Sequence, residues 1–321
     1  MKVFANALEM IGNTPMVRVN HIDTGPCELY LKLETQNPGM SIKDRIAVSM
    51  IAAAEADGKI KPGDTLIEAT AGNTGLGLAL VAAQKGYKLI IVLPDKMSRE
   101  KLYNLRALGA EVIETRSDVQ KGHPEYYQDV ALRISKERDA FYINQFENPA
   151  NVTAHYETTG PEMWQQMDGK LDAFVCGVGS GGTLTGVGRY LREQNPDVDL
   201  VLADPDGSIL APLINEGKEV EAGSWRIEGI GEDFIPVICD IALAGKAYAI
   251  SDKESFDVAR EVLLKEGVMV GSSSGTLIAA ALRYCREQTE AKRVVTLACD
   301  TGCRYLSKLF NDEWLAAQDF E

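Results

Sequence analysis

Short apolar runs alternate with segments of helical periodicity along almost the whole chain. The apolar runs predict strands at 29–33, 65–68, 88–93, 111–114, 141–143, 173–176, 200–203 and 294–298. The periodic segments predict helices at 45–57, 74–85, 98–108, 124–137, 157–166, 183–194, 253–266 and 275–290. Gly58, Gly86 and Gly109 follow three of these helices and fit the role of a C-terminal stop. The repeated strand–helix units predict an α/β fold with two open, mostly parallel twisted sheets covered by helices.

One segment departs from this alternation. Residues 207–245 have little periodicity and many glycines, so we interpret them as a long functional loop region. Open parallel sheets bind ligands at the carboxyl ends of their strands, so the turns that follow the strands are the places to search for a site.

Composition and charge narrow the class of protein. The 321 residues suit two α/β lobes, and the formal net charge of -14 disfavours nucleic acid as a partner. No apolar run approaches the roughly 20 residues of a membrane span, so we expect no membrane association. The start of the chain lacks the features of a signal peptide, and the expected location is the cytoplasm. Three widely separated histidines and six cysteines without a C-x-x-C pair predict no metal site.

A glycine-rich turn at 177–183 follows a predicted strand and precedes a predicted helix. Its sequence is Gly-Val-Gly-Ser-Gly-Gly-Thr, which lets backbone N–H groups approach an anion at the helix start. We therefore expect a phosphate here. The stretch also matches the G-x-G-x-x-G pattern of dinucleotide sites, with Asp204 about 20 residues further on, so a nicotinamide-dependent oxidoreductase is an alternative.

Two other turns carry small polar side chains at predicted helix starts. Residues 70–75, Thr-Ala-Gly-Asn-Thr-Gly, offer amides for a carboxylate, and Asn73 adds a side chain that both donates and accepts. Residues 271–275, Gly-Ser-Ser-Ser-Gly, place three hydroxyls between glycines. Simple helix capping is the alternative interpretation of both turns.

Lys43 lies where a turn runs into the helix predicted from residue 45. A cation is disfavoured at the positive end of a helix, so we expect its amine to lose its proton more easily than usual. A neutral amine is what Schiff-base chemistry requires, whereas most lysines are solvated surface groups.

Together these features resemble the cystathionine β-synthase and cysteine synthase family of fold-type II pyridoxal phosphate enzymes, which have a tryptophan synthase β-like fold. The resemblance runs from Ile-Gly-Asn-Thr-Pro at 11–15 to Arg-Tyr-Leu-Ser at 304–307. It implies that Lys43, within Ser-Ile-Lys-Asp-Arg, holds the cofactor and acts as the catalytic base. It also implies a smaller mobile domain at 45–144, and a larger domain at 1–44 and 145–321 that carries the cofactor phosphate site.

The same resemblance implies roles for the residues of the three turns. Asn73 matches the residue that hydrogen-bonds the ring hydroxyl of the cofactor, and Ser273 matches the serine that faces its pyridine nitrogen. The substrate carboxylate is expected at Thr70, Ala71, Gly72, Asn73, Thr74 and Gln145. The cofactor phosphate is expected at Gly179, Ser180, Gly181, Gly182 and Thr183.

The implied reaction replaces a leaving group on the β-carbon of L-serine or O-acetyl-L-serine with a thiol. Residues 229–236, Gly-Ile-Gly-Glu-Asp-Phe-Ile-Pro, resemble cystathionine β-synthases, for which homocysteine is the acceptor. The tail at 299–307 resembles cysteine synthases, which use sulfide, and consumption of cysteine with release of hydrogen sulfide is a third alternative. Family members are usually homodimers, so the expected partners are a second copy of the chain and small amino acid and thiol substrates.

Three positions bear on the choice of substrate. Ala71 replaces a serine of most family members, and Met40 replaces a common glycine, so we expect Met40 to narrow the pocket. Gly231 and Glu232 are expected beside the substrate, where Glu232 would deprotonate an incoming thiol or water. A solvated loop carboxylate is the alternative for Glu232, and a non-catalytic amino acid sensor is the alternative for the whole chain.

Overall fold

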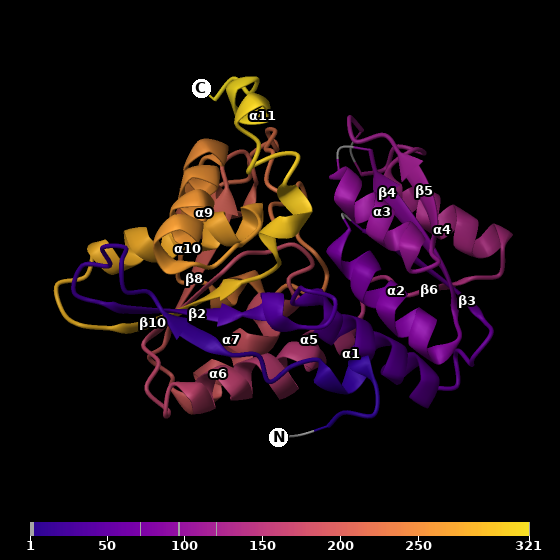
Figure 1. The fold of residues 1–321 in the computed structure, drawn as a ribbon, viewed down its shortest axis with the longest axis horizontal. Helices are drawn as coiled ribbons and strands as arrows, with labels where there is room; N and C mark the ends of the chain where they lie inside the picture. Colours follow the sequence, from indigo (N-terminus) through magenta and orange to yellow (C-terminus); the bar gives the residue numbers. More distant parts are fainter. Residues whose placement is uncertain (1–2, 71, 96, 120, 321) are drawn as a thin grey trace.

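The computed structural model describes residues 3–70, 72–95, 97–119 and 121–320. In these parts of the chain, the strands form one six-stranded and one four-stranded sheet, each covered by helices (Figure 1). All strand pairs are parallel except the pair at one edge of the larger sheet. The predicted α/β fold with two open, mostly parallel sheets is therefore confirmed.

The larger sheet has the strand order β1-β2-β10-β7-β8-β9. Its strands are β1 Met16–Arg18, β2 Glu28–Leu33, β7 Ala173–Cys176, β8 Asp199–Pro205, β9 Lys246–Ile250 and β10 Arg293–Ala298. The central strands are buried on both faces, which explains why they appear in the sequence as continuous apolar runs.

The smaller sheet has the order β5-β4-β3-β6, and its two faces are covered by different helices. Its strands are β3 Thr65–Ala69, β4 Lys88–Pro94, β5 Glu111–Thr115 and β6 Phe141–Tyr142. Leu89, Ile91 and Leu93 of β4 pack with helices α1 Lys43–Ala56, α2 Asn73–Lys85 and α3 Arg99–Ala107. Ile90 and Val92 point to the opposite face and pack with α4 Tyr127–Glu137. Side chains alternate along a strand, so each face acquires its own apolar core.

The larger sheet is covered by a second set of helices. They are α6 Gly160–Gln166, α7 Gly182–Gln194, α8 Leu210–Glu216, α9 Asp252–Glu266 and α10 Ser272–Arg286, followed by the short α11 Asp312–Ala316. Almost every residue of α10 is buried, because it packs on β10 and also under α9. Beneath the sheet in Figure 1, α5 Pro149–Ala154 continues through a π-helix, His155–Thr159, into α6.

Local signals in the sequence explain several helix ends. Gly86 adopts the left-handed conformation at the end of α2, and Gly58 and Gly109 have positive φ just after α1 and α3. Ser251 accepts a hydrogen bond from the backbone of Glu254 and so caps the start of α9. The predicted stop role of the three glycines is confirmed.

The structure differs from the predicted elements in a few places. The segment 207–245 contains α8 and a short 3-10 helix, Ile241–Leu243, and is therefore not entirely loop. Strands β1 and β9, at the two edges of the larger sheet, were not predicted. Helix α10 begins at Ser272 rather than at residue 275, so the three serines lie in its first turn and not before it.

Among the described helices, none is long and apolar enough to cross a membrane. The division into a smaller domain at 45–144 and a larger domain from the rest of the chain stays a prediction. It agrees in outline with the two sheets, since β3 to β6 lie within 65–142.

Candidate active site

A cavity of about 380 Å³ opens between the two sheets, at the ends of several parallel strands. The predicted site residues that line it are Lys43, Thr70, Gly72, Asn73, Thr74, Gln145, Gly179, Ser180, Gly181, Thr183, Gly231, Glu232 and Ser273. Gly182 is not among the described lining residues, and Ala71 lies outside the part of the chain that the structure describes. The fold thus brings turns from distant parts of the sequence to one place.

Lys43 is half-buried and lines this cavity as the first residue of α1. Within the described part of the chain, its amine makes no ion pair and no hydrogen bond. Burial lowers the pKa of Lys43, while Cys299, Glu232 and Asp300 act in the opposite direction. The predicted lowering is confirmed in direction, and its main cause is burial.

The turn before Lys43 has a backbone conformation at residue 40 that favours glycine. Met40 has a φ of 58°, a left-handed conformation that disfavours any side chain. Its side chain is half exposed and is not among the described residues that line the cavity. The expectation that Met40 narrows the pocket is therefore wrong.

The turn at residues 70–74 leads from β3 into α2 and leaves the first amides of that helix without a side-chain cap. Thr70 Oγ1 accepts a hydrogen bond from Gly72 N at 3.1 Å, which tightens the turn. Thr74 Oγ1 donates to Gln145 Oε1 at 2.7 Å, and Gln145 Nε2 donates to Ala69 O at 3.1 Å. Gln145 thus lies beside the turn, and both line the cavity, where backbone amides at a helix start suit an anion.

Asn73 begins α2 and is held by two residues from the end of the chain. Its Nδ2 donates to Asp300 Oδ2 at 2.7 Å, and its Oδ1 accepts from Arg304 Nη1 at 2.8 Å. These partners were not predicted, because nothing in the sequence indicates that residues 300 and 304 return to the turn after β3.

The glycine-rich turn after β7 leads into α7. Gly181 is in the left-handed conformation, and no side chain caps the helix, so its first amides are available to an anion. A Cβ at Gly182 would lie 2.0 Å from Asn151 Oδ1, so only glycine fits there. Asn151 in turn donates to Ser180 Oγ at 2.9 Å. The turn thus offers backbone amides to an anion, and the phosphate site stays a prediction.

His155 contacts the end of the glycine-rich turn, although its place in the sequence does not predict a role at the site. It lies in the π-helix, with Nδ1 2.9 Å from Thr159 Oγ1 and Nε2 3.2 Å from Thr183 Oγ1. Burial lowers the pKa of His155 well below its usual value, so the ring is neutral and can fix the Thr183 hydroxyl. The π-helix, which carries no recognisable sequence signal, creates this placement.

The three serines at the start of α10 have different roles. Ser272 Oγ accepts from Glu228 N at 3.2 Å, and Ser274 Oγ accepts from Cys299 N at 2.9 Å. Ser273 lines the cavity and, within the described residues, its hydroxyl makes no hydrogen bond to the protein. The structure thus leaves the hydroxyl of Ser273 available to a ligand.

Acidic and aromatic side chains form the wall of the cavity near Glu232. Glu232 and Asp233 line it from the segment between α8 and β9, and Tyr126, Tyr127 and Trp225 line it as well. Burial raises the pKa of Tyr126, with the nearby Asp233 adding to it, and burial together with Glu232 raises the pKa of Tyr127. The two carboxylates and the two phenols thus line the same cavity.

Lys101 and Glu228 form a buried ion pair at the cavity that sequence reasoning missed. Lys101 Nζ donates to Glu228 Oε2 at 2.8 Å and to Tyr305 OH at 3.0 Å. The stem of Lys101 packs against the turn at Gly72, as a Cβ added to Gly72 would lie 2.6 Å from Lys101 Cδ. In the sequence, Lys101 is one charged residue among several on a polar helix, so no pattern distinguishes it.

Asp204 does not support the dinucleotide alternative. It is fully buried as the second-last residue of β8, and its Oδ2 accepts from the backbone N of Ala211 at 2.8 Å, in the first turn of α8. Burial raises the pKa of Asp204 to about 6. A carboxylate sealed beneath a helix, and not among the described lining residues, is not available to a ribose.

Comparison with known proteins adds independent information. A family model described as "Pyridoxal-phosphate dependent enzyme" matches residues 7–300. Cystathionine β-synthase from Mus musculus is 45% identical over 323 residues, which covers 99% of this chain and 57% of the mouse protein. Cysteine synthase from Staphylococcus aureus strain N315 is 43% identical over 305 residues, covering 94% of this chain and 95% of that protein. The chain spans between 57% and 64% of the length of the cystathionine β-synthases that it matches.

Solved structures give the same picture. A hydrogen sulfide-producing enzyme from Fusobacterium nucleatum superimposes with a TM-score of 0.89 at 39% identity, covering 95% of this chain and 100% of that one. O-ureido-L-serine synthase superimposes with a TM-score of 0.89 at 34% identity, covering 98% and 100% of the two chains.

Proposed function

Because the chain belongs to the family of pyridoxal-phosphate dependent enzymes, within its cystathionine β-synthase and cysteine synthase branch, we propose that it replaces a leaving group on the β-carbon of a serine-type amino acid with a thiol. The observation that carries this proposal is the Lys43 amine, which lines the cavity, makes no ion pair within the described residues and has a lowered pKa. A half-buried lysine with no ion pair is costly to keep charged, and it is suited to Schiff-base and proton-transfer chemistry.

Pyridoxal phosphate is the cofactor of this family, and the cavity offers a partner for each of its polar groups. The Lys43 amine suits the aldehyde, and the uncapped start of α7 suits the phosphate. The Ser273 hydroxyl suits the pyridine nitrogen, and the Asn73 amide suits the ring hydroxyl. These residues therefore fit the cofactor.

When bound, the cofactor withdraws electrons from the α-carbon of the amino acid, which makes its proton removable. Lys43 then acts as the general base that takes the α-proton, and it later returns a proton to the same carbon. The amides of the turn at residues 70–74, together with Gln145, hold the substrate carboxylate so that the α-proton faces Lys43. Ser273, a weakly acidic hydroxyl, does not keep the pyridine nitrogen protonated as a carboxylate would, which suits elimination more than transamination.

We propose homocysteine as the acceptor thiol, as in a cystathionine β-synthase. Support comes from the wall formed by Glu232 and Asp233 beside Tyr126 and Tyr127. Carboxylates and aromatic faces attract the ammonium group of an amino-acid thiol and repel the hydrosulfide anion. Glu232 is the group proposed to deprotonate the incoming thiol.

Two other acceptor and donor choices remain within the same reaction class. Sulfide as acceptor would make the chain a cysteine synthase, and the relatives of that name match over nearly their full length. Cysteine as donor would release hydrogen sulfide, and one similar structure is of an enzyme described as producing it.

We further propose that residues 45–144 move as a unit and close over the substrate. Contacts that would stabilise the closed arrangement include the Lys101–Glu228 pair and the amine of Lys121, which lies 4.1 Å from the centroid of the Phe234 ring. Closure would exclude water from the reacting carbon. A homodimer in the cytoplasm is the expected form of the protein.

The experiment that tests the reaction is a matrix of donors and acceptors. The purified chain with pyridoxal phosphate is mixed with L-serine, O-acetyl-L-serine or L-cysteine, each with homocysteine, sulfide or cysteine, and products are identified by mass spectrometry. Cystathionine from serine and homocysteine is the expected main product, and Lys43→Ala is the control that should form none. Glu232→Gln should lower turnover with homocysteine. If the variant turned over every thiol as fast as the unaltered protein does, a role for Glu232 would be excluded. Absence of any thioether or thiol product would contradict the proposed function.

A further inference from the structure

We propose that Asp300 and Arg304 are positioning residues that fix the side-chain amide of Asn73, and so the hydrogen bond that Asn73 gives to the ring hydroxyl of the cofactor. This inference rests on the proposed function and goes beyond it, because neither residue lines the described cavity.

A carboxamide has a donor end and an acceptor end of nearly the same shape, so it can rotate by half a turn with little steric cost. Arg304 can only donate, and it donates to Asn73 Oδ1 at 2.8 Å. A carboxylate can only accept, and Asp300 Oδ2 accepts from Asn73 Nδ2 at 2.7 Å. Together the two partners permit one orientation, which leaves the second N–H of Asn73 for a ligand.

The burial of Asp300 costs free energy, so a contribution to protein stability does not explain its position. It is fully buried, and Tyr305 OH also donates to its Oδ2 at 2.7 Å. Its Oδ1 makes no hydrogen bond within the described residues, and burying such an oxygen costs free energy. A Cβ at Gly271 would lie 2.1 Å from this Oδ1, so the chain makes room for the carboxylate. A role at the neighbouring Asn73 accounts for keeping it.

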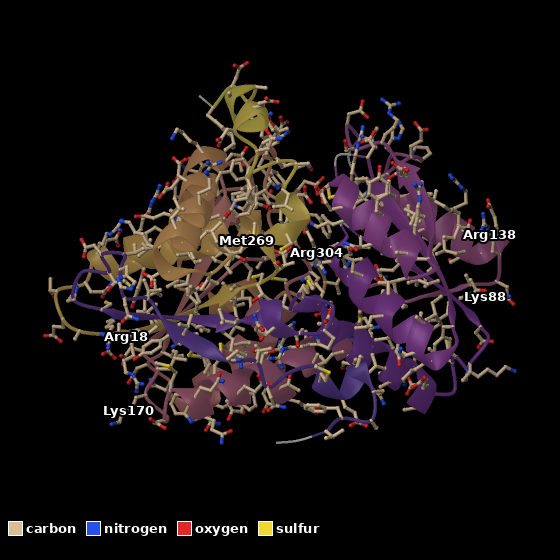
Figure 2. All side chains as sticks on the ribbon, viewed as in Figure 1. Arg18, Lys88, Arg138, Lys170, Met269 and Arg304 are labelled. Atoms are coloured by element: carbon tan, nitrogen blue, oxygen red, sulfur yellow. The ribbon has the colours of Figure 1, made fainter. Side chains whose placement is uncertain are left out.

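Arg304 connects Asn73 with the turn that leads to Lys43. Its side chain lies where the segment after β10 meets the helices of the smaller sheet (Figure 2). Arg304 Nη2 donates to Gly39 O, and Gly39 N donates to Asp44 Oδ2, next to Lys43. One side chain thus contacts both the turn that leads to Lys43 and the amide of Asn73, and the proposed function places Lys43 and Asn73 against the cofactor.

The test measures the affinity of the apoprotein for pyridoxal phosphate and for the same molecule without its 3-hydroxyl group. If Arg304 acts through Asn73 on that hydroxyl, Arg304→Met weakens binding of pyridoxal phosphate about tenfold. Binding of the deoxy analogue should stay within about twofold, because it cannot receive the hydrogen bond. In an Asn73→Ala background, Arg304→Met should cause no further loss for either ligand.

Matched variants separate positioning from general destabilisation. Thr296→Val removes a buried hydrogen bond to Val175 O in β10 without touching Asn73, so it should affect both ligands equally. Arg304→Lys keeps the charge but offers one ammonium for two acceptors, so its loss should be intermediate; it replaces Arg304→Met if that variant does not fold. Asp300→Asn should lower affinity for pyridoxal phosphate in the same selective way.

Three results would overturn the inference. The first is that Arg304→Met weakens both ligands equally, the second is that its effect adds fully to that of Asn73→Ala, and the third is a selective effect of Asn73→Ala without one of Arg304→Met. Failure of the unaltered protein to bind pyridoxal phosphate would instead contradict the proposed function. The third result would leave the proposed function standing and remove only the positioning role.

Discussion

The amine of Lys101 lies 2.8 Å from a carboxylate oxygen of Glu228, and this buried contact joins the helices of the smaller sheet to the larger sheet. Glu228 has a second partner, because Lys308 Nζ lies 2.7 Å from its other oxygen. The attraction of Lys101 and Lys308 lowers the pKa of Glu228 although burial opposes it. Because Glu228 has two lysine partners, replacing Glu228 and replacing Lys101 are expected to lower the stability of the protein by different amounts.

We expect Glu228→Gln to destabilise the protein more than Lys101→Met. Glu228→Gln leaves Lys101 charged and buried with neutral partners in place of a carboxylate, the new amide and the Tyr305 phenol, at a cost of about 3–5 kcal/mol. Lys101→Met leaves Glu228 still paired with Lys308, so the cost should be smaller. Urea denaturation of the apoprotein measures both, with Arg189→Gln at an exposed pair with Asp240 as a control, expected to cost less than about 1 kcal/mol. The reverse order would show that Lys308 does not compensate for Lys101.

The lowered pKa of Lys43 predicts a pH-dependent cost in the apoprotein. In the folded state the amine binds its proton less tightly than in the unfolded chain, so stability from this group rises with pH between the lowered folded pKa and the ordinary lysine pKa of 10.5. Lys43→Met should therefore raise the melting temperature of the apoprotein near neutral pH, and the gain should shrink as the pH approaches 10. Thermal melts of both proteins across this range, without cofactor, provide the measurement. A gain that does not change with pH would mean that packing, and not charge, causes it.

Met40→Gly should stabilise the protein or leave its stability unchanged. The left-handed backbone at Met40 costs a non-glycine residue on the order of 1–2 kcal/mol, and glycine removes that cost but adds roughly 0.5–1 kcal/mol of backbone entropy. The half-exposed side chain of Met40 contributes little packing in return. Denaturant midpoints compare the two proteins; a loss of more than about 1 kcal/mol would show that the Met40 side chain makes a needed contact.

Gly182→Ala should be strongly destabilising and should abolish tight cofactor binding. The added Cβ would lie 2.0 Å from Asn151 Oδ1, and overpacking of this kind typically costs about 1–3 kcal/mol or more. Gly245→Ala is the matched control, because a Cβ there meets nothing within 4 Å. Melting temperature and cofactor affinity are measured for both variants. If both variants changed the melting temperature and the cofactor affinity equally little, Asn151 could move aside without disturbing the glycine-rich turn at 177–183.

Much of the fold could be predicted because its signals are local. Gly86 ends α2 in the left-handed conformation that glycine favours, and the buried strands appear as apolar runs. The edge strands β1 and β9 escaped prediction because they are short and partly exposed: β1 has no fully buried residue, and β9 is exposed at its first and fourth residues. Helix α8 escaped because its seven residues are too few to show periodicity.

The candidate site divides in the same way. Turns with a repeated residue pattern, such as the one that ends at Thr183, could be found from the sequence, whereas their supporting residues could not. His155 reaches Thr183 through a π-helix, and Asp300 and Arg304 reach Asn73 from the far end of the chain. Such contacts depend on tertiary packing, which leaves no periodic signal in a single sequence.

The central claim is that Lys43 holds pyridoxal phosphate, and one measurement tests it most directly. The protein incubated with the cofactor is reduced with borohydride, digested, and mapped by mass spectrometry for the lysine that carries the reduced cofactor. The account predicts a single modified peptide that contains Lys43. Modification of Lys101 or another lysine instead, or no modification of a folded protein, would contradict it.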